Sequence, residues 1–219
     1  MKDWRLIYII FAKSEDKLYI SNKNRQAYFV LLSVCIIFVR INSKNCNVMF
    51  DKETYVQRRA LLKKNIGSGV LLFLGNDEQG LNYEDNAFRY RQDSTFLYYF
   101  GLSFAGLSAI IDIDEDKEII FGDELTIDHI VWMGTQPTLK EKSERVGIRE
   151  TLPSVAIISY LHKAVQKGQT VHYLPPYRPE HKLKLMDWLG IPPARQEGSV
   201  PFIRAVVAQR NYKSAEEIA

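Results

Sequence analysis

The stretch Gly67-Ser68-Gly69-Val70-Leu71-Leu72-Phe73-Leu74 decides the fold of this 219-residue chain. Its five consecutive apolar residues match the length of a strand, and an apolar run without polar alternation is typical of a strand covered on both faces. The glycines end a helix that we predict over residues 51–65, with Asp51 as its N-cap. On this helix the spacing predicts Tyr55, Val56, Ala60 and Leu62 toward the core, and Arg58, Arg59, Lys63 and Lys64 toward solvent.

Strands and helices alternate along the rest of the chain. Residues 107–113 and 117–121 flank Asp114-Glu115-Asp116 and predict a hairpin. Strands interleaved with helices favour an α/β fold in which a mixed β-sheet is flanked by helices. Residues 49–219 are enough to form one self-sufficient core. The further elements that we predict are strands at 129–133 and 170–174, and helices at 138–146, 152–166, 179–189 (ended by Gly190) and 200–209.

The first 48 residues differ in composition from the rest. They carry eight Lys or Arg against three Asp or Glu, a net charge of +5, whereas residues 49–219 carry 21 against 23, a net charge of −2. Their apolar run at 27–39 is shorter than the ~20 residues that span a bilayer, and no signal-cleavage pattern follows it. A membrane anchor or signal, and an extra strand or helix, both stay open. We favour a leader outside the native fold, because Met49 precedes what reads as a capped helix.

Composition and cysteine content narrow the function classes. The chain is 46% hydrophobic and 25% charged, which argues against a disordered chain or a disulfide scaffold. Because residues 49–219 are slightly acidic, nucleic-acid binding is disfavoured. Cys35 and Cys46 both precede Met49, so the predicted domain has no thiol for catalysis or metal ligation. So few cysteines favour a reducing compartment, and we expect a cytoplasmic protein without stable membrane insertion.

Residues 49–219 contain no complete catalytic or metal-binding motif. The fingerprints of dinucleotide-binding folds, P-loops and serine hydrolases are absent. The four histidines lack the spacing of a metal site, so each is expected to be a surface or structurally satisfied residue. Asp112, Asp114 and Asp116 mimic the start of a calcium loop, but Lys117 stands where the turn needs glycine. We interpret these acids as the turn of the hairpin.

The segment 83–102 concentrates aromatic and charged side chains. Within it, Arg91 is close enough in sequence to Asp85 and Asp93 to pair with either carboxylate in bidentate fashion. A plainer alternative stays open, in which the loop is held by its own ion pairs and residues 98–100 form a core strand.

This segment resembles part of the amino-terminal domain of aminopeptidase P (Xaa-Pro aminopeptidase), of the creatinase and prolidase type. Residues 90–102, Tyr-Arg-Gln-Asp-Ser-Thr-Phe-Leu-Tyr-Tyr-Phe-Gly-Leu, match the family run Y/F-R-Q-x-S-x-F-x-Y-x-x-G-F/L. Residues 57–61, 130–134 and 210–218 are similar, in order, to the family's R-R-x-x-L, I-W-x-G and R-x-x-K-S-x-E-E-I segments. Arg89 departs from the family, which often has proline there. The resemblance covers residues 49–219.

The resemblance implies a three-layer α/β domain at 49–210, preceded by the leader 1–48 and followed at 211–219 by the start of a linker. Family members hold two metal ions, usually manganese, in a carboxy-terminal catalytic domain, whose ligands would all lie beyond Ala219. This chain is therefore expected to contain no catalytic residue and no metal ligand, and to be inactive alone.

The resemblance also implies a role for the domain. The whole protein would be a metallo-aminopeptidase that releases the N-terminal residue from peptides with proline in second position. In the family this domain takes part in homo-oligomer contacts, as a dimer or tetramer, and reaches a neighbouring subunit's active site. By position, Asp85 matches a family acid near the substrate's amino end, and Trp132 matches a tryptophan that lines the neighbouring subunit's active site. Asp85, Trp132 and Arg91 are therefore the candidate substrate-binding residues.

Two alternatives to this role stay open. One is the same domain of a prolidase-like or creatinase-like relative with another substrate. The other is a stand-alone binding or scaffold domain, against which residues 213–217 argue because they read as the first turn of a further helix.

Overall fold

The computed structural model describes residues 50–83, 86–127, 130–131, 134 and 136–218. All of these residues belong to the unit Asn47–Ala219. The predicted leader lies outside the described residues. Within the described ranges, no helix is both long enough and apolar enough to cross a membrane.

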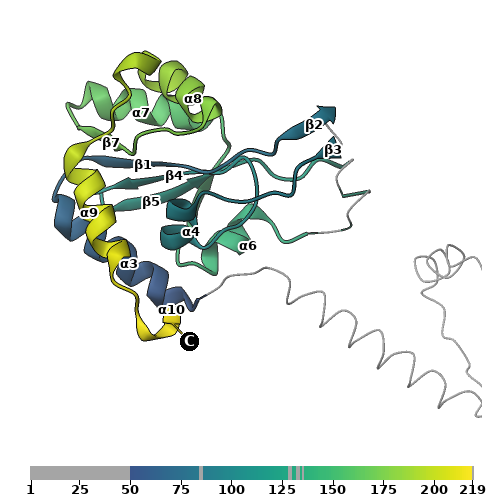
Figure 1. The fold of residues 1–219 in the computed structure, drawn as a ribbon, viewed down its shortest axis with the longest axis horizontal. Helices are drawn as coiled ribbons and strands as arrows, with labels where there is room; N and C mark the ends of the chain where they lie inside the picture. Colours follow the sequence, from purple (N-terminus) through teal and green to yellow (C-terminus); the bar gives the residue numbers. More distant parts are fainter. Residues whose placement is uncertain (1–49, 84–85, 128–129, 132–133, 135, 219) are drawn as a thin grey trace, which may run out of the picture. The chain divides into compact units, whose positions relative to one another are not determined.

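A five-stranded mixed sheet forms the centre of the fold, with the strand order β6-β5-β4-β1-β7 (Figure 1). Strand β1 (Val70–Leu74) pairs antiparallel with the central strand β4 (Ser108–Asp112) and parallel with β7 (Val171–Tyr173). On the other side, β5 (Lys117–Phe121) pairs antiparallel with β4 and parallel with β6 (Glu150–Leu152). Val70 to Phe73 are buried, as predicted for a strand covered on both faces.

Helices pack on both faces of this sheet, because successive side chains of a strand point to opposite faces. Leu71 and Phe73 pack into one apolar cluster, and Val70 and Leu72 into another. Figure 1 shows α7 and α8 on the opposite side of the sheet from α3 and α4. The first cluster includes residues of α3 (Lys52–Ile66), α4 (Ser94–Phe100), α6 (Leu139–Glu144) and α9 (Val200–Asn211), and the second includes residues of α7 (Ala156–Gln166) and α8 (Pro179–Leu189).

Further short elements lie outside these two helical layers. A two-stranded hairpin of β2 (Gly80–Tyr83) and β3 (Asn86–Ala87) extends away from the central sheet in Figure 1. The 3-10 helix η1 (Pro193–Arg195) follows α8, and α10 (Ala215–Ile218) follows α9.

Besides β1, most of the predicted elements are confirmed, and three places differ. The helices at 51–65, 138–146, 179–189 and 200–209, the hairpin and the strand near 170–174 are all present. The helix predicted from residue 152 begins at Ala156 instead, because residues 150–152 pair with β5 and Pro153 disfavours a helical conformation before it. Residues 98–100, considered as a strand, belong to α4.

The strand predicted at 129–133 is wrong for the two of its residues that the structure describes. Ile130 and Val131 are helical, and the amides of Ile130 and Gly134 donate to the carbonyls four residues earlier, at 3.1 and 2.9 Å. Val131 is 73% exposed, so this apolar run does not form the buried strand that its composition suggested.

The prediction that Arg58 and Arg59 of α3 face solvent is wrong. Arg58 and Arg59 are 8% and 0% exposed, whereas Val56 and Ala60, predicted to face the core, are exposed. The buried Arg59 side chain finds three partners that replace water: Glu118 Oε2 at 2.7 Å, and the carbonyls of Tyr99 and Val146, both at 2.9 Å. A charged side chain can be buried when its donors are all hydrogen-bonded. The spacing of polar residues along a helix does not reveal whether such partners exist.

Candidate functional site

Of the three candidate substrate-binding residues, the structure describes only Arg91. Asp85 and Trp132 lie outside the described residues, so their predicted roles stay predictions. Arg91 is exposed in the loop before α4, and its backbone carbonyl accepts a hydrogen bond from Asn76 Nδ2 at 2.8 Å.

Two neighbours of Arg91 instead join the loop after β1 to the loop after α4. Gln92 is buried; its Oε1 accepts from the amides of Asn76 and Asp93 at 2.7 and 2.9 Å, and its Nε2 donates to the Phe104 carbonyl at 2.9 Å. The Tyr90 hydroxyl donates to the same carbonyl at 2.9 Å. Burial, followed by the charge of Asp77, raises the pKa of Tyr90, which keeps this hydroxyl protonated as a donor.

Asp93 caps α4 rather than pairing with Arg91. Its Oδ1 accepts from the amides of Thr95 and Phe96 at 2.8 and 2.9 Å, and its Oδ2 accepts from the Tyr177 hydroxyl at 3.0 Å. The pairing of Arg91 with Asp93 that the sequence suggested is therefore corrected: the carboxylate satisfies the first turn of the helix, which would otherwise leave amides unpaired. Burial, and then Asp93, raises the pKa of Tyr177.

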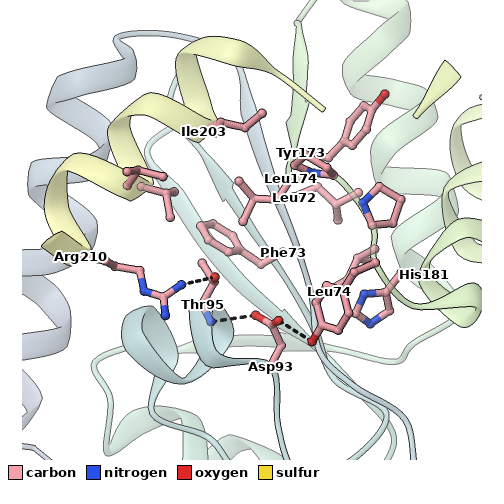
Figure 2. Close-up of a pocket in the computed structure, with 15 residues that line it drawn as sticks. Leu72, Phe73, Leu74, Asp93, Thr95, Tyr173, Leu174, His181, Ile203 and Arg210 are labelled. Atoms are coloured by element: carbon pink, nitrogen blue, oxygen red, sulfur yellow. Dashed lines mark hydrogen bonds between the residues drawn. The ribbon is translucent and has the colours of Figure 1, made fainter. Parts of the chain in front are cut away.

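A pocket of about 260 Å³ opens beyond the ends of β1 and β7 (Figure 2). Asp93 and Thr95 of the α4 start, Arg210 of α9 and Tyr177 of the loop after β7 supply its polar groups. Along one side, Arg210 Nη1 donates to Thr95 Oγ1 at 2.8 Å and the Thr95 amide donates to Asp93 (Figure 2). Asp93 in turn accepts from the Tyr177 hydroxyl. Residues of β1 and α9, such as Phe73 and Ile203, contribute apolar lining.

His181 of α8 lies at the same pocket and is 4% exposed. Its Nε2 lies 3.0 Å from the Gly75 carbonyl and donates to it. Burial lowers the pKa of His181, so a neutral ring is favoured there. This is the structurally satisfied histidine that the sequence analysis expected.

No pattern in the sequence groups the pocket residues Asp93, Tyr177, His181 and Arg210. Tyr177 is 84 positions from Asp93, and Arg210 is 115 positions from Thr95. Arg210 was visible only as the first residue of the R-x-x-K-S-x-E-E-I segment, and nothing in that pattern indicates a pocket.

The two ends of the domain meet at Arg58. Its Nη1 donates to the Tyr98 carbonyl at 2.9 Å, its Nη2 forms a salt bridge with Glu217 at 2.7 Å, and its guanidinium lies 4.0 Å from the centre of the Tyr98 ring. The resembling segments near the start of α3 and at α10 therefore contact one another directly. This contact holds α10 against α3.

A sequence model described as aminopeptidase P, N-terminal domain, matches residues 55–173. The matched residues make up more than half of the chain. The chain belongs to the aminopeptidase P N-terminal domain family. The sequence motifs in residues 57–61 and 90–102 lie inside this match, so the resemblance is confirmed.

Curated relatives of this aminopeptidase P N-terminal domain are named as Xaa-Pro peptidases. A probable Xaa-Pro aminopeptidase of Chaetomium globosum is 30% identical over 112 residues, which cover 49% of this chain and 18% of the relative. Human Xaa-Pro dipeptidase is 33% identical over 90 residues, which cover 40% of this chain and 18% of the relative. The match thus spans about a fifth of either curated protein.

Solved structures of aminopeptidases P share the fold of this domain. Aminopeptidase PepP of Pseudomonas aeruginosa superposes with a TM-score of 0.64 at 22% identity, over 78% of this chain and 41% of that chain. A zinc-substituted Escherichia coli aminopeptidase P in complex with product superposes with a TM-score of 0.63 at 20% identity, over 77% and 41%. These likenesses confirm the α/β fold with a mixed sheet flanked by helices.

The resemblance places two manganese ions in a carboxy-terminal domain beyond Ala219, and not among the residues of this aminopeptidase P N-terminal domain. No group of three or more His, Cys, Asp or Glu side chains among the described residues is arranged to hold a metal ion. The acids that mimic a calcium loop are engaged elsewhere: Asp112 accepts from Tyr160 and Gln169, and Asp114 accepts from the Gly69 amide. They close the hairpin turn, as the sequence analysis expected.

Proposed function

We propose that this domain is the non-catalytic amino-terminal part of a cytoplasmic, dinuclear-metal Xaa-Pro aminopeptidase. In this proposal the complete protein releases the N-terminal residue from peptides with proline in second position, and a carboxy-terminal domain holds its two manganese ions. The observation that carries the proposal is the family match over residues 55–173. A probable Xaa-Pro aminopeptidase among the relatives gives the substrate class.

The work of the domain in this proposal is assembly and substrate restriction. Asp85, Arg91 and Trp132 reach the active site of a neighbouring subunit in a homo-oligomer, where Asp85 attracts the substrate's ammonium group and Trp132 forms an apolar wall. The extended β2–β3 hairpin supports a surface contact, because Leu81, Tyr83 and Phe88 are 52%, 62% and 57% exposed. Apolar patches of this kind are typical of protein interfaces.

The test uses the complete protein that contains this chain, loaded with manganese. We expect cleavage of Ala-Pro-Ala but not of Ala-Ala-Ala, loss of activity with a chelator, and no activity from residues 1–219 alone. Light scattering should give a dimer or tetramer that a chain lacking residues 50–218 does not form. Cleavage of both peptides at equal rates, or a monomer with full activity, would contradict the proposal.

A second candidate function is the same domain in an Xaa-Pro dipeptidase, which the similarity to human Xaa-Pro dipeptidase favours. The two reactions differ in the length of the accepted peptide. Cleavage of the dipeptide Ala-Pro with little cleavage of Ala-Pro-Ala would establish the dipeptidase, and the reverse ratio the aminopeptidase.

A further inference from the structure

The pocket beyond β1 and β7 lies where α/β folds commonly bind ligands. β1 and β7 are parallel neighbours, and residues 72–74 and 173–174 at their carboxyl ends line the pocket. Crevices outside the carboxyl ends of parallel strands are frequent ligand sites, because the loops diverge there and leave room. The pocket volume of about 260 Å³ is just below the range for drug-sized ligands. Its size therefore suits a small metabolite.

Arg210 brings a positive charge to this pocket that no described carboxylate neutralises. None of the salt bridges among the described residues includes Arg210. The nearby Asp93 carboxylate is already occupied by two α4 amides and the Tyr177 hydroxyl. A guanidinium has several N–H donors, and the bond to Thr95 uses one of them. The remaining donors suit a carboxylate, which arginine binds in bidentate fashion.

Much of the remaining lining of the pocket is apolar. Phe73, Leu174, Ile203 and Val206 contribute to it. An apolar lining beside a guanidinium selects a ligand with an aliphatic body and an acidic head, since each part then meets a matching surface.

We propose that this pocket binds a small carboxylic acid with a branched aliphatic body, its carboxylate on Arg210 and its body against Phe73, Leu174, Ile203 and Val206. A free apolar amino acid and a simple branched acid share this chemistry. Only the amino acid carries an ammonium group, which the Asp93 carboxylate at the same pocket attracts. The site stands independently of the proposed peptidase function.

Titration of the 219-residue chain by calorimetry and NMR tests the site with three probes of similar body: leucine, isocaproate and isoamylamine. We expect both acids to bind at up to millimolar concentration and isoamylamine, which lacks the carboxylate, to bind at least about ten-fold more weakly. Tighter binding of leucine than of isocaproate would identify an amino-acid site, and equal binding a site for simple acids. Binding of neither acid at millimolar concentration, or equal binding of isoamylamine, would overturn the proposal.

Variants distinguish the contribution of the pocket residues to ligand binding from that of other residues of α9. Arg210→Gln should weaken acid binding by about ten-fold or more, whereas Arg204→Gln, an exposed arginine of the same helix outside the pocket, should leave binding unchanged. Because Arg210 also bonds to Thr95, a second variant fills the pocket from a half-exposed position: Val207→Trp should abolish binding while the melting temperature stays near that of the native chain. Unchanged acid binding in both Arg210→Gln and Val207→Trp would overturn the site.

Discussion

At the scale of single residues, Arg59 explains why an arginine stands on the inner face of α3. Its fully buried guanidinium donates to Glu118 and to the carbonyls of Tyr99 and Val146. Burial lowers the pKa of Arg59, and the charge and hydrogen bond of Glu118 oppose that shift. One side chain thus connects α3 to β5, to the end of α4 and to the loop after α6.

Gly101 is a second residue whose identity the packing requires. It ends α4 with φ 62°, and a Cβ there would lie 2.4 Å from Tyr55 Cζ. Gly190 ends α8 with φ 66° and has nothing within 4 Å of such a Cβ. We expect Gly190→Ala to lower the free energy of unfolding by about 1 kcal/mol, from backbone strain alone.

Gly101→Ala should cost about 2 kcal/mol more than Gly190→Ala, because the ring of the buried Tyr55 must also move. Urea unfolding of both variants measures the difference. Equal losses would show that Tyr55 yields without cost and that the close approach is unimportant.

His181 predicts a pH dependence of stability. Since burial lowers its pKa in the folded state below the ordinary value of about 6.5, the unfolded chain binds more protons below that pH. The stability contribution is therefore complete above about pH 6.5 and is lost as the pH falls toward the folded-state pKa. His172, whose pKa burial also lowers, acts in the same direction.

His181→Gln should keep the donor to the Gly75 carbonyl and flatten the fall in unfolding free energy between about pH 7 and about pH 5. His162→Gln, on the exposed side of α7, serves as the control and should retain the native slope. Urea unfolding across this range measures both variants. A slope in His181→Gln as steep as in the native chain would contradict the assignment.

At the scale of elements, α4 shows how a short helix is stabilised at both ends. Asp93 satisfies its first amides, Gly101 ends it in a left-handed conformation, and Phe96 and Phe100 are buried beneath it. The aromatic-rich family segment is therefore structural through most of its length. Local caps supply what seven residues lack in helix propensity.

The attachment of α10 to α3 belongs to the same scale. Glu217 Oε1 pairs with Arg58, and its Oε2 accepts from the Ser214 amide at 2.9 Å, which caps the helix. The side chains of Arg58 and Glu217 are only 9% and 10% exposed, so the salt bridge is little screened by solvent.

Glu217→Ala should release α10 and speed tryptic cleavage after Lys213 by about ten-fold, which corresponds to ~1.4 kcal/mol of local opening. The melting temperature should fall little, because the core clusters do not include α10. Glu197→Ala, which removes an exposed carboxylate elsewhere, is the control and should leave cleavage unchanged. Mass spectrometry of timed digests measures the rates, and equal rates in all three chains would show that the salt bridge does not hold α10.

At the scale of the whole molecule, the question is whether Asp85 and Trp132 serve a neighbouring subunit. In the complete protein, Asp85→Ala and Trp132→Ala should each lower kcat/KM by about ten-fold, or ~1.4 kcal/mol of transition-state binding, with little change in melting temperature. Val131→Ala, beside Trp132 and 73% exposed, should leave both quantities unchanged.

Mixed oligomers identify the subunit that supplies these residues. Combining either variant with subunits inactivated at the metal site should restore activity where the intact neighbour contributes the residue. If both variants keep full activity while Trp132→Ala lowers the melting temperature, Trp132 is a structural residue of the domain. The resemblance would then have assigned its role wrongly.

The sequence by itself determined the elements whose signals are local. The apolar run of β1, the acidic turn between β4 and β5, and α8 with its glycine cap all appear where the patterns predict them. The family motifs likewise identified the fold, because the caps and buried aromatic residues of α4 lie within a few positions of one another. Helical and strand periodicity reflects burial on one face or both, and such burial can be read from neighbouring residues.

Only the tertiary structure decided which polar residues are buried and which distant groups meet. Arg58 and Arg59 have the spacing of solvent-facing residues, yet partners 40 to 159 positions away replace their water. The pocket of Asp93, Tyr177 and Arg210 likewise joins three segments remote in sequence. Periodicity records whether a side chain is apolar, whereas burial of a charge depends on donors and acceptors that meet it only after the chain has folded.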